Sequence, residues 1–159
     1  MYKQKKKIAI LGGSGKLGQK IVSFIVNQNK YKVYLIGRKK VKTKSKETVV
    51  IKINFQSLKE KKQLKNILNN CDYIINCTGE NINENRMYET NYILVKEILK
   101  LLKPKSNLHF IHFSTCAVFG ASALTGQNNK SLFIEENRKV KPSNLYERTK
   151  YQAEQVIVS

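Results

Sequence analysis

The stretch Gly12-Gly13-Ser14-Gly15-Lys16-Leu17-Gly18 is the most informative part of this sequence. It follows a short apolar run over 7–11 and opens a segment with the apolar spacing of a helix over 16–26. Residues without a Cβ let the backbone approach a phosphate closely, and the start of a helix offers unpaired N–H groups with a partial positive charge. The spacing G-x-x-G-x-x-G of Gly12, Gly15 and Gly18 therefore predicts a pyrophosphate-binding loop, with a plain tight turn as the alternative.

The rest of the sequence alternates between apolar runs and amphipathic segments. We expect strands over 7–11, 32–36, 48–53, 72–77 and 108–114, helices over 16–26, 58–68, 85–102 and 145–158, and a long polar connection over 121–144. Strands alternating with helices predict an α/β fold, a Rossmann-type doubly wound parallel sheet with helices on both faces. Ligands of such a sheet bind at the carboxyl ends of its strands. We expect residues 1–159 to form one such domain.

The charge is the unusual feature of the composition. The 159 residues include 30 Lys and Arg against 11 Asp and Glu, a formal net charge of +19. Such an excess is typical of proteins that bind nucleic acid or another anionic surface. Only four of the 30 are arginines, and Lys, Asn and Ile are all abundant. Composition therefore favours AT-rich codon usage over a selected phosphate-reading surface, which would use more arginine.

Neither a membrane segment nor a metal site is expected. No apolar run approaches the ~20 residues of a membrane helix, and the apolar segment after the basic start is too short for a signal peptide. The three cysteines form no C-x-x-C pair, and His109 and His112 have no companions at ligand spacing. We expect a cytoplasmic protein without a disulfide framework.

Arg38 bears on the choice of dinucleotide. In dinucleotide-binding folds an acidic residue about 20 positions after the glycine loop holds the ribose hydroxyls. Here that position falls on Arg38, within Ile36-Gly37-Arg38-Lys39-Lys40, and no acid is present. A cation there favours the 2′-phosphate of NADP, so we expect NADP rather than NAD. The alternative is a set of solvated loop residues in a chain that is basic throughout.

Tyr146 and Lys150 form a candidate acid/base pair. Their i, i+4 spacing places them on one face of the last predicted helix. A lysine ammonium beside a tyrosine favours the phenolate, so the pair can exchange a proton with a hydroxyl or carbonyl. Ser114 and Thr115 end the fifth predicted strand, where a hydroxyl could hydrogen-bond the same oxygen. The alternative for a Tyr-x-x-x-Lys spacing is an ordinary surface pair.

Taken in this order, these features resemble the extended short-chain dehydrogenase/reductase superfamily, in its NAD(P)-dependent epimerase/dehydratase family. The resemblance is carried by LGGSGKLG (11–18), DYIINCTG (72–79), MYETNYILVKEIL (87–99), FSTCAVFG (113–120) and PSNLYERTKYQAE (142–154). It implies that Tyr146 is the acid/base, that Lys150 tunes it and holds the nicotinamide ribose, and that Thr115 holds the substrate oxygen. The implied cofactor-binding residues are Gly12, Ser14, Gly15, Lys16, Leu17, Gly18, Arg38, Asn54, Phe55, Cys77, Thr78, Gly79, Tyr146 and Lys150.

The sequence departs from the family's pattern in several places. Asn54 stands where the family usually has an Asp that touches adenine, and Cys77 and Thr78 take the place of alanines. Relatives are about twice as long, so we expect this chain to lack the C-terminal half that builds the substrate lobe, as a fragment or as a shortened protein. The family also pairs the helices expected here over 85–102 and 145–158 across a dimer, which implies a homodimer.

The resemblance implies an NAD(P)-dependent epimerase, dehydratase or carbonyl reductase acting on a nucleotide-sugar or a similar hydroxy or keto substrate. Two alternatives are a non-catalytic module that binds nucleotide or RNA through its basic surface, and a cofactor sensor. Asn91 either organises the site by bonding backbone or only satisfies a buried polar group. Cys116, one residue past Thr115, is expected to be a buried, inert thiol.

Overall fold

A computed structural model describes residues 4–38, 45–54, 57–120 and 134–159. The chain forms two compact units, each with its own packing. The first unit comprises Met1–Thr78 and Lys100–Phe113, and the second comprises Gly79–Leu99 and Ser114–Ser159. Helix α4 runs from Leu94 to Leu101 across the boundary between them.

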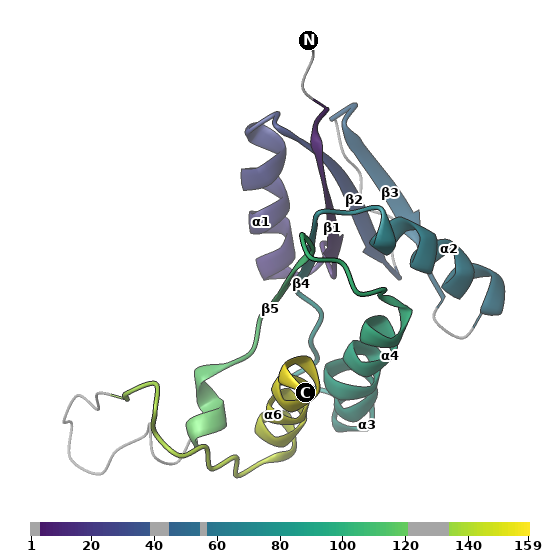
Figure 1. Cartoon of the computed structure of the whole chain (residues 1–159). Coiled ribbons are helices and arrows are strands. Elements are labelled where there is room, and N and C mark those ends of the chain that lie inside the picture. Colours follow the sequence, from purple (N-terminus) through teal and green to yellow (C-terminus); the bar gives the residue numbers. More distant parts are fainter. Residues whose placement is uncertain (1–3, 39–44, 55–56, 121–133) are drawn as a thin grey trace. The chain divides into compact units, whose positions relative to one another are not determined.

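The first unit is built on a parallel sheet in the order β3-β2-β1-β4-β5 (Figure 1). Its strands are β1 (Lys6–Leu11), β2 (Tyr31–Gly37), β3 (Thr48–Lys52), β4 (Tyr73–Asn76) and β5 (His109–His112). The chain leaves β1 in the middle of the sheet, builds outward through β2 and β3, and then crosses to the other side for β4 and β5. This reversal at β1 is the switch point where doubly wound sheets bind their ligands.

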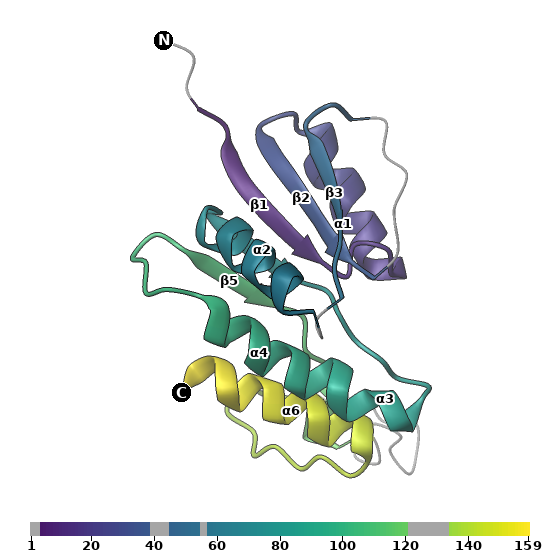
Figure 2. The ribbon, with the colours of Figure 1, turned by 90° about the vertical axis from the view of Figure 1, so that its right-hand side faces the viewer.

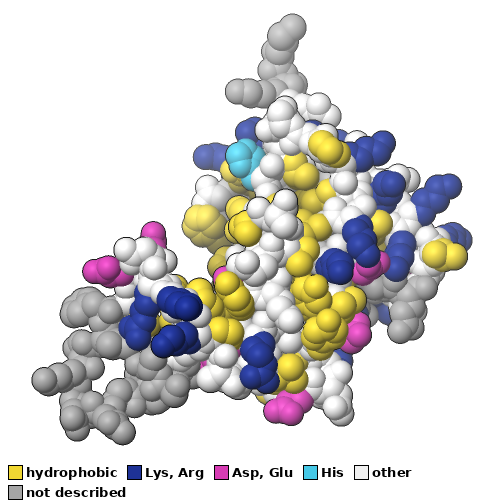
Figure 3. All heavy atoms as spheres, turned by 60° about the horizontal axis from the view of Figure 1, so that its bottom comes forward, with side chains coloured by type: hydrophobic (Ala, Val, Ile, Leu, Met, Phe, Trp, Pro, Cys, Tyr) yellow, Lys and Arg dark blue, Asp and Glu magenta, His cyan; other side chains and the backbone are white. Residues whose placement is uncertain are grey.

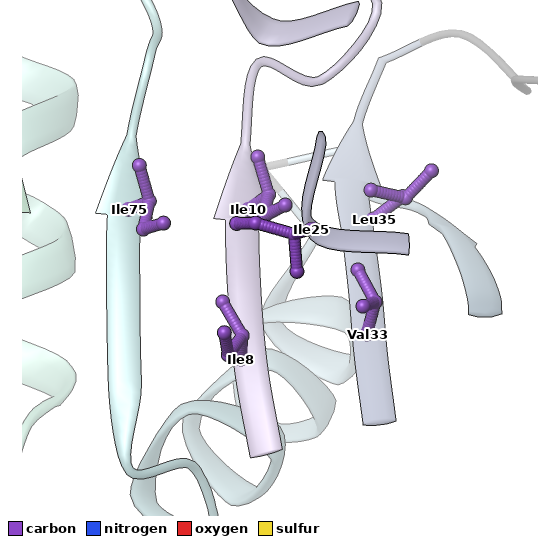
Figure 4. Close-up of a cluster of buried hydrophobic side chains, with 6 residues drawn as sticks. All are labelled: Ile8, Ile10, Ile25, Val33, Leu35 and Ile75. Atoms are coloured by element: carbon purple, nitrogen blue, oxygen red, sulfur yellow. The ribbon is translucent and has the colours of Figure 1, made fainter. Parts of the chain in front are cut away.

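A cluster of aliphatic side chains covers one face of this sheet (Figure 4). Successive residues of a strand point to opposite faces, so Ile8 and Ile10 of β1 share a face. They pair in register with Val33 and Leu35 of β2, which are buried with them. Ile25 of helix α1 (Lys16–Asn27) joins the cluster, with Ile21, Val22 and Val26 packed alongside. This packing fixes the start of α1 at the carboxyl end of β1.

Helices α1 and α2 (Leu58–Asn69) cover opposite faces of the sheet, as the two views in Figures 1 and 2 show. Leu64 and Leu68, four residues apart on α2, are fully buried. Ser57 caps the start of α2 by accepting a hydrogen bond from the Glu60 N–H at 3.4 Å. The predicted doubly wound parallel sheet with helices on both faces is confirmed.

The second unit is helical. Its elements are α3 (Glu84–Tyr88), the π-helical turn η1 (Glu89–Ile93), most of α4, the 3₁₀ turn η2 (Cys116–Phe119) and α6 (Leu145–Val158). Helix α6 packs against α3 and η1 (Figure 2). Met87 and Val95 are buried on the long helical segment, and Ala153 is buried on α6.

The predicted elements are all present, but two regions differ from expectation. The helix expected over 85–102 is not one regular α-helix, because a π turn interrupts it at Glu89–Ile93. A π turn is rare and is defined by backbone hydrogen bonds, which apolar spacing does not report. The turn η2 was not predicted, and residues 121–133 of the expected 121–144 connection lie outside the described residues. Within the described ranges, no helix is both long and apolar enough to cross a membrane.

Candidate cofactor and catalytic site

The glycine loop joins β1 to α1 in the first unit. Gly12 has φ +77°, and a Cβ there would lie 2.9 Å from the backbone carbon of Cys77 and from the nitrogen of Thr78. A Cβ on Gly18 would lie 2.4 Å from the Gly12 carbonyl oxygen. Position 12 therefore requires glycine, because its φ is positive and because the backbone after the neighbouring strand leaves no room for a Cβ. Position 18 requires glycine because α1 packs closely against the loop. Both glycines serve the fold.

Gly15 is different, because the fold makes little demand on it. It is the N-cap of α1 with φ −74° and ψ 166°, a backbone conformation open to any residue. A Cβ there would meet only the Gly12 oxygen, at 3.4 Å, which is ordinary contact. Gly15, Ser14, Lys16 and Leu17 are all exposed. What a glycine at this position provides is open space above the start of a helix.

That space suits an anion. No side chain caps the start of α1, and its first turn contains no acidic residue. The first N–H groups of a helix carry partial positive charge and bind phosphate when nothing else satisfies them. The glycine loop therefore fits the pyrophosphate of a dinucleotide.

Three further predicted residues lie near the carboxyl ends of the strands of this unit. Arg38 is exposed directly after β2. Asn54 is exposed shortly after β3, and its N–H donates to the Glu60 carboxylate. Phe55 lies outside the described residues. Cys77 follows β4, and its N–H donates to the Leu11 carbonyl at 2.9 Å, which holds it beside the glycine loop.

Thr78 is held in place by a buried amide. Asn76 is fully buried at the end of β4. Its Oδ1 accepts from the Thr78 N–H at 3.0 Å and from the Thr78 hydroxyl at 2.6 Å. Its Nδ2 lies 3.0 Å from Nδ1 of His112 on β5. His112 is thereby a structural partner of the strand end, and the described residues contain no cluster able to hold a metal ion.

In the second unit, a capping box fixes the start of α6. Asn144, the N-cap, accepts from the Glu147 N–H at 2.9 Å through Oδ1. The Glu147 carboxylate returns to accept from the N–H and the hydroxyl of Ser143, at 2.6 and 2.8 Å. Glu147 is fully buried. The pattern Asn-x-x-Glu is an N-terminal signature that sequence reasoning could have found, and it sets the position of Tyr146 between its two ends.

Tyr146 and Lys150 lie one turn apart on α6. Tyr146 is half-buried, whereas Lys150 exposes only 3% of its surface. A Cβ built on Gly79 would lie 3.8 Å from the Lys150 Nζ and 3.8 Å from Oδ1 of Asn91. Gly79, Asn91 and Lys150 therefore converge. A nearly buried lysine is rare, because removing an ammonium from water is costly unless other groups interact with it.

Asn91 organises this region through backbone hydrogen bonds. Its Oδ1 accepts from the Glu80 N–H at 2.8 Å, and its Nδ2 donates to the Glu80 carbonyl at 2.9 Å. The same Nδ2 lies 3.1 Å from the Thr149 hydroxyl, which itself donates to the Tyr146 carbonyl at 3.0 Å. Asn91 is fully buried and bonds the backbone of Glu80, so these contacts satisfy its amide and also hold the segment after Gly79. The π turn carries Asn91, and such turns are frequent at functional sites.

The segment that follows Gly79 is also held by Glu80. Its carboxylate accepts from the N–H groups of Ile82 and Asn83, at 3.1 and 3.2 Å. These hydrogen bonds lower the pKa of the Glu80 carboxyl. Sequence reasoning missed both Glu80 and Thr149. The carboxylate contacts of Glu80 are local but carry no periodic signal, whereas the contact of Thr149 with Asn91 joins segments far apart in the chain.

The two candidate hydroxyls after β5 have different partners. Ser114 donates to the Glu154 carboxylate of α6. Thr115 caps η2 by accepting from the Ala117 N–H at 3.2 Å, so its own O–H can still donate. The expectation of a buried thiol at Cys116 is wrong: Cys116 is exposed, because η2 turns it outward while burying Val118.

The predicted residues thus fall into two groups. The first unit gathers the glycine loop, Arg38, Asn54, Cys77 and Thr78, and the second gathers Gly79, Thr115, Tyr146 and Lys150. A family model, the NAD dependent epimerase/dehydratase family, matches residues 8–159. The match includes both groups, and the chain belongs to this family.

The solved structures of similar fold include nucleotide-sugar enzymes and a uronate dehydrogenase. A dTDP-glucose 4,6-dehydratase from Bacillus anthracis, in complex with NAD, is 21% identical with a TM-score of 0.75 over 95% of this chain and 49% of its own. A UDP-glucuronic acid 4-epimerase from Bacillus cereus, in complex with NAD, is 18% identical with a TM-score of 0.74 over 96% and 51%. A uronate dehydrogenase from Agrobacterium tumefaciens is 12% identical with a TM-score of 0.74 over 96% and 54%.

The chain spans about half the length of these solved proteins. At such low identity the likeness establishes the fold alone. A search among curated proteins finds no sequence that matches this chain.

Proposed function

We propose that this chain binds a nicotinamide dinucleotide and supplies the acid/base residues of an epimerase, dehydratase or carbonyl reductase. The burial of Lys150 carries the proposal. A surface Tyr/Lys pair would leave the ammonium in water, but Lys150 is 3% exposed, one turn after Tyr146. Family membership supports the same conclusion. A lysine held at this position has a role in the chemistry of the site rather than in solubility.

The glycine loop would hold the pyrophosphate of the dinucleotide at the open start of α1, above Gly15. When bound, the nicotinamide supplies hydride transfer to or from a carbon of the substrate. Arg38 would interact with a 2′-phosphate, which favours NADP over NAD. Its exposure directly after β2 leaves the guanidinium accessible to such a ligand.

Three side chains of the second unit would handle the proton. The Tyr146 hydroxyl would give a proton to, or take one from, the reacting oxygen. The Lys150 ammonium, one turn further along α6, would attract the negative charge that develops on the reacting oxygens during that transfer. Thr115 would donate its O–H to the same oxygen and hold it in place. Asn91 and Glu147 are positioning residues, since they fix the segments on which the reacting groups are carried.

The similar proteins support a substrate class. Two of them are named for UDP-glucuronic acid and dTDP-glucose, and a third, MoeE5, is in complex with UDP-glucose and NAD. We propose a nucleotide-sugar or a similar hydroxy or keto compound.

The test compares Tyr146→Phe with Tyr151→Phe, a matched change on the next turn of α6. Cofactor affinity is measured from NADH and NADPH fluorescence, and turnover with UDP-glucose, UDP-glucuronic acid and dTDP-glucose. We expect Tyr146→Phe to lower turnover by about 10²–10⁴-fold while both variants keep cofactor affinity within a few fold. Full turnover in Tyr146→Phe would refute the acid/base role. Failure of the unaltered chain to bind either dinucleotide would refute the proposal as a whole.

A further inference from the structure

The net charge of the chain is confined to one of its two units. The first unit contains 22 Lys and Arg against 3 Asp and Glu, a formal charge of +19. The second contains 8 of each, a formal charge of zero. The unit boundaries come from the fold and cross the sequence twice, so inspection of the sequence alone does not reveal this division.

Codon usage does not explain the division. A drift toward AT-rich codons raises Lys and Asn together, wherever the chain tolerates them. Asn is divided evenly, with 8 residues in each unit, whereas Lys numbers 21 in the first unit and 5 in the second. Acidic residues are also depleted in the first unit. The abundance of lysine and the scarcity of acidic residues in the first unit therefore need a cause that acts on charge. Selection for binding an anionic partner is such a cause.

We propose that the outer face of α2 and the adjoining segment after α4 form a binding surface for single-stranded nucleic acid. We call this surface the lysine track: Lys59, Lys62, Lys65, Lys103 and Lys105. Lys59, Lys62 and Lys65 follow one another at intervals of three on α2, and all three are exposed. Lys59 and Lys62 lie on the side opposite to the buried Leu64 and Leu68, and Lys65 lies on the flank between the two sides. They extend over about 9 Å of helix.

Asn69 connects the two parts of the track. Its Nδ2 donates to the Leu101 carbonyl at 2.9 Å, and its Oδ1 accepts from the Lys103 N–H at 2.7 Å. The segment that carries Lys103 and Lys105 therefore lies directly against the end of α2. Figure 3 shows lysine and arginine side chains gathered on its right, the side on which α2 lies in Figure 1.

Little on this surface offsets the positive charge. Glu60 is the only acidic residue of α2, and its carboxylate accepts from the N–H of Asn54. Lys105 donates to the Cys71 carbonyl at 3.1 Å, a neutral partner that leaves its charge uncompensated. Cations left in this way attract a polyanion and release its counterions on binding.

The chemistry of the track favours a nucleic-acid backbone without base reading. Lysines are point charges and lack the planar fork with which arginine reads guanine. A single strand can bend over a convex helix and onto the next loop, whereas duplex DNA is stiff over about 150 base pairs. An anionic membrane would require several exposed apolar or aromatic residues among the lysines, whereas α2 exposes one large apolar residue, Leu58.

The experiment uses the full chain and a fluorescent single-stranded RNA of about 20 nucleotides. Binding is measured by anisotropy at several salt concentrations. With five lysines on phosphates, the slope of log K against log[salt] is about −3.5, a loss of about 100-fold in affinity between 50 and 200 mM. One variant reverses three charges of the track (Lys62→Glu, Lys65→Glu, Lys103→Glu). A matched control reverses three exposed lysines elsewhere in the first unit (Lys30→Glu, Lys32→Glu, Lys46→Glu).

Both variants change the net charge equally, so only the position of the charges differs. We expect the track variant to lose more than about 10-fold in affinity, with a slope of about −1.4, and the control to lose less than about 3-fold. Circular dichroism checks that each variant folds. Equal losses in the two variants, or no binding by the unaltered chain, would overturn the proposal. So would binding to vesicles of anionic phospholipid that requires the track while RNA binding does not.

Discussion

Replacing Gly15 by alanine distinguishes a glycine needed by a ligand from glycines needed by the fold. The alanine Cβ would meet only the Gly12 oxygen, at 3.4 Å, and φ is −74°. Alanine is a poorer N-cap than glycine by up to about 1 kcal/mol. It also removes freedom from the unfolded chain, which stabilises by about 0.4–1 kcal/mol. These effects nearly cancel, so we expect the melting temperature to change by less than about 2 °C.

Gly18→Ala is the matched comparison. Its Cβ would lie 2.4 Å from the Gly12 oxygen and 2.8 Å from the Gly13 Cα, both backbone atoms. Overpacking of this kind costs about 1–3 kcal/mol or more, which lowers the melting temperature by about 3–10 °C in a chain of this size. The two variants differ by the position of one methyl group in the same loop.

Cofactor affinity provides the decisive measurement. A methyl group above the start of α1 would stand where the pyrophosphate approaches. We expect Gly15→Ala to bind NADH and NADPH about 10–100-fold more weakly, or about 1.4–2.8 kcal/mol, while remaining as stable as the unaltered chain. Fluorescence titration and thermal unfolding of the same samples test both statements. Undiminished affinity in a stable Gly15→Ala would refute the assignment of this loop to the pyrophosphate.

The remaining predictions concern specificity, organisation and ionisation. Arg38→Ala should weaken NADPH more than NADH in the fluorescence titration, and equal losses would refute a 2′-phosphate contact. Asn91→Ala should destabilise the chain by about 2–4 kcal/mol in denaturant unfolding, because it leaves backbone groups of Glu80 without partners; a loss below about 0.5 kcal/mol would contradict the organising role. Burial raises the pKa of Cys71 from 9.0 to about 11, so at pH 8 iodoacetamide should label exposed Cys116 before Cys71. Below pH 9 the Cys71 thiol keeps its proton in both the folded and the unfolded chain, so the stabilisation is fully present. Between pH 9 and 11 the unfolded chain loses that proton first, so the free energy of unfolding should fall by about 2–3 kcal/mol more than that of Cys71→Ala. Identical pH profiles for the two proteins would contradict the shift.

Local sequence signals were sufficient for the strands and for the regular helices. A short continuous apolar run located β1, and the helix predicted over 145–158 matches α6. The π turn at Glu89–Ile93 was not predicted, because the polar contacts made from it by Asn91, to Glu80 and Thr149, join segments that the apolar pattern does not relate. Exposure of Cys116 escaped prediction for a similar reason, since it follows from an irregular turn without any periodic pattern.

The sequence by itself determined the class of fold, the glycine loop and the order of the Thr, Tyr and Lys residues that identify the family, because these are carried by spacing along the chain. Only the tertiary structure decided which of these residues the fold itself requires. Gly12 and Gly18 are constrained by backbone atoms brought close by folding, and Gly15 is not. Likewise, only folding shows that Lys150 is buried and that the net charge belongs to one unit. Burial and charge segregation are properties of neighbours in space, and residues far apart in the chain become neighbours only when it folds.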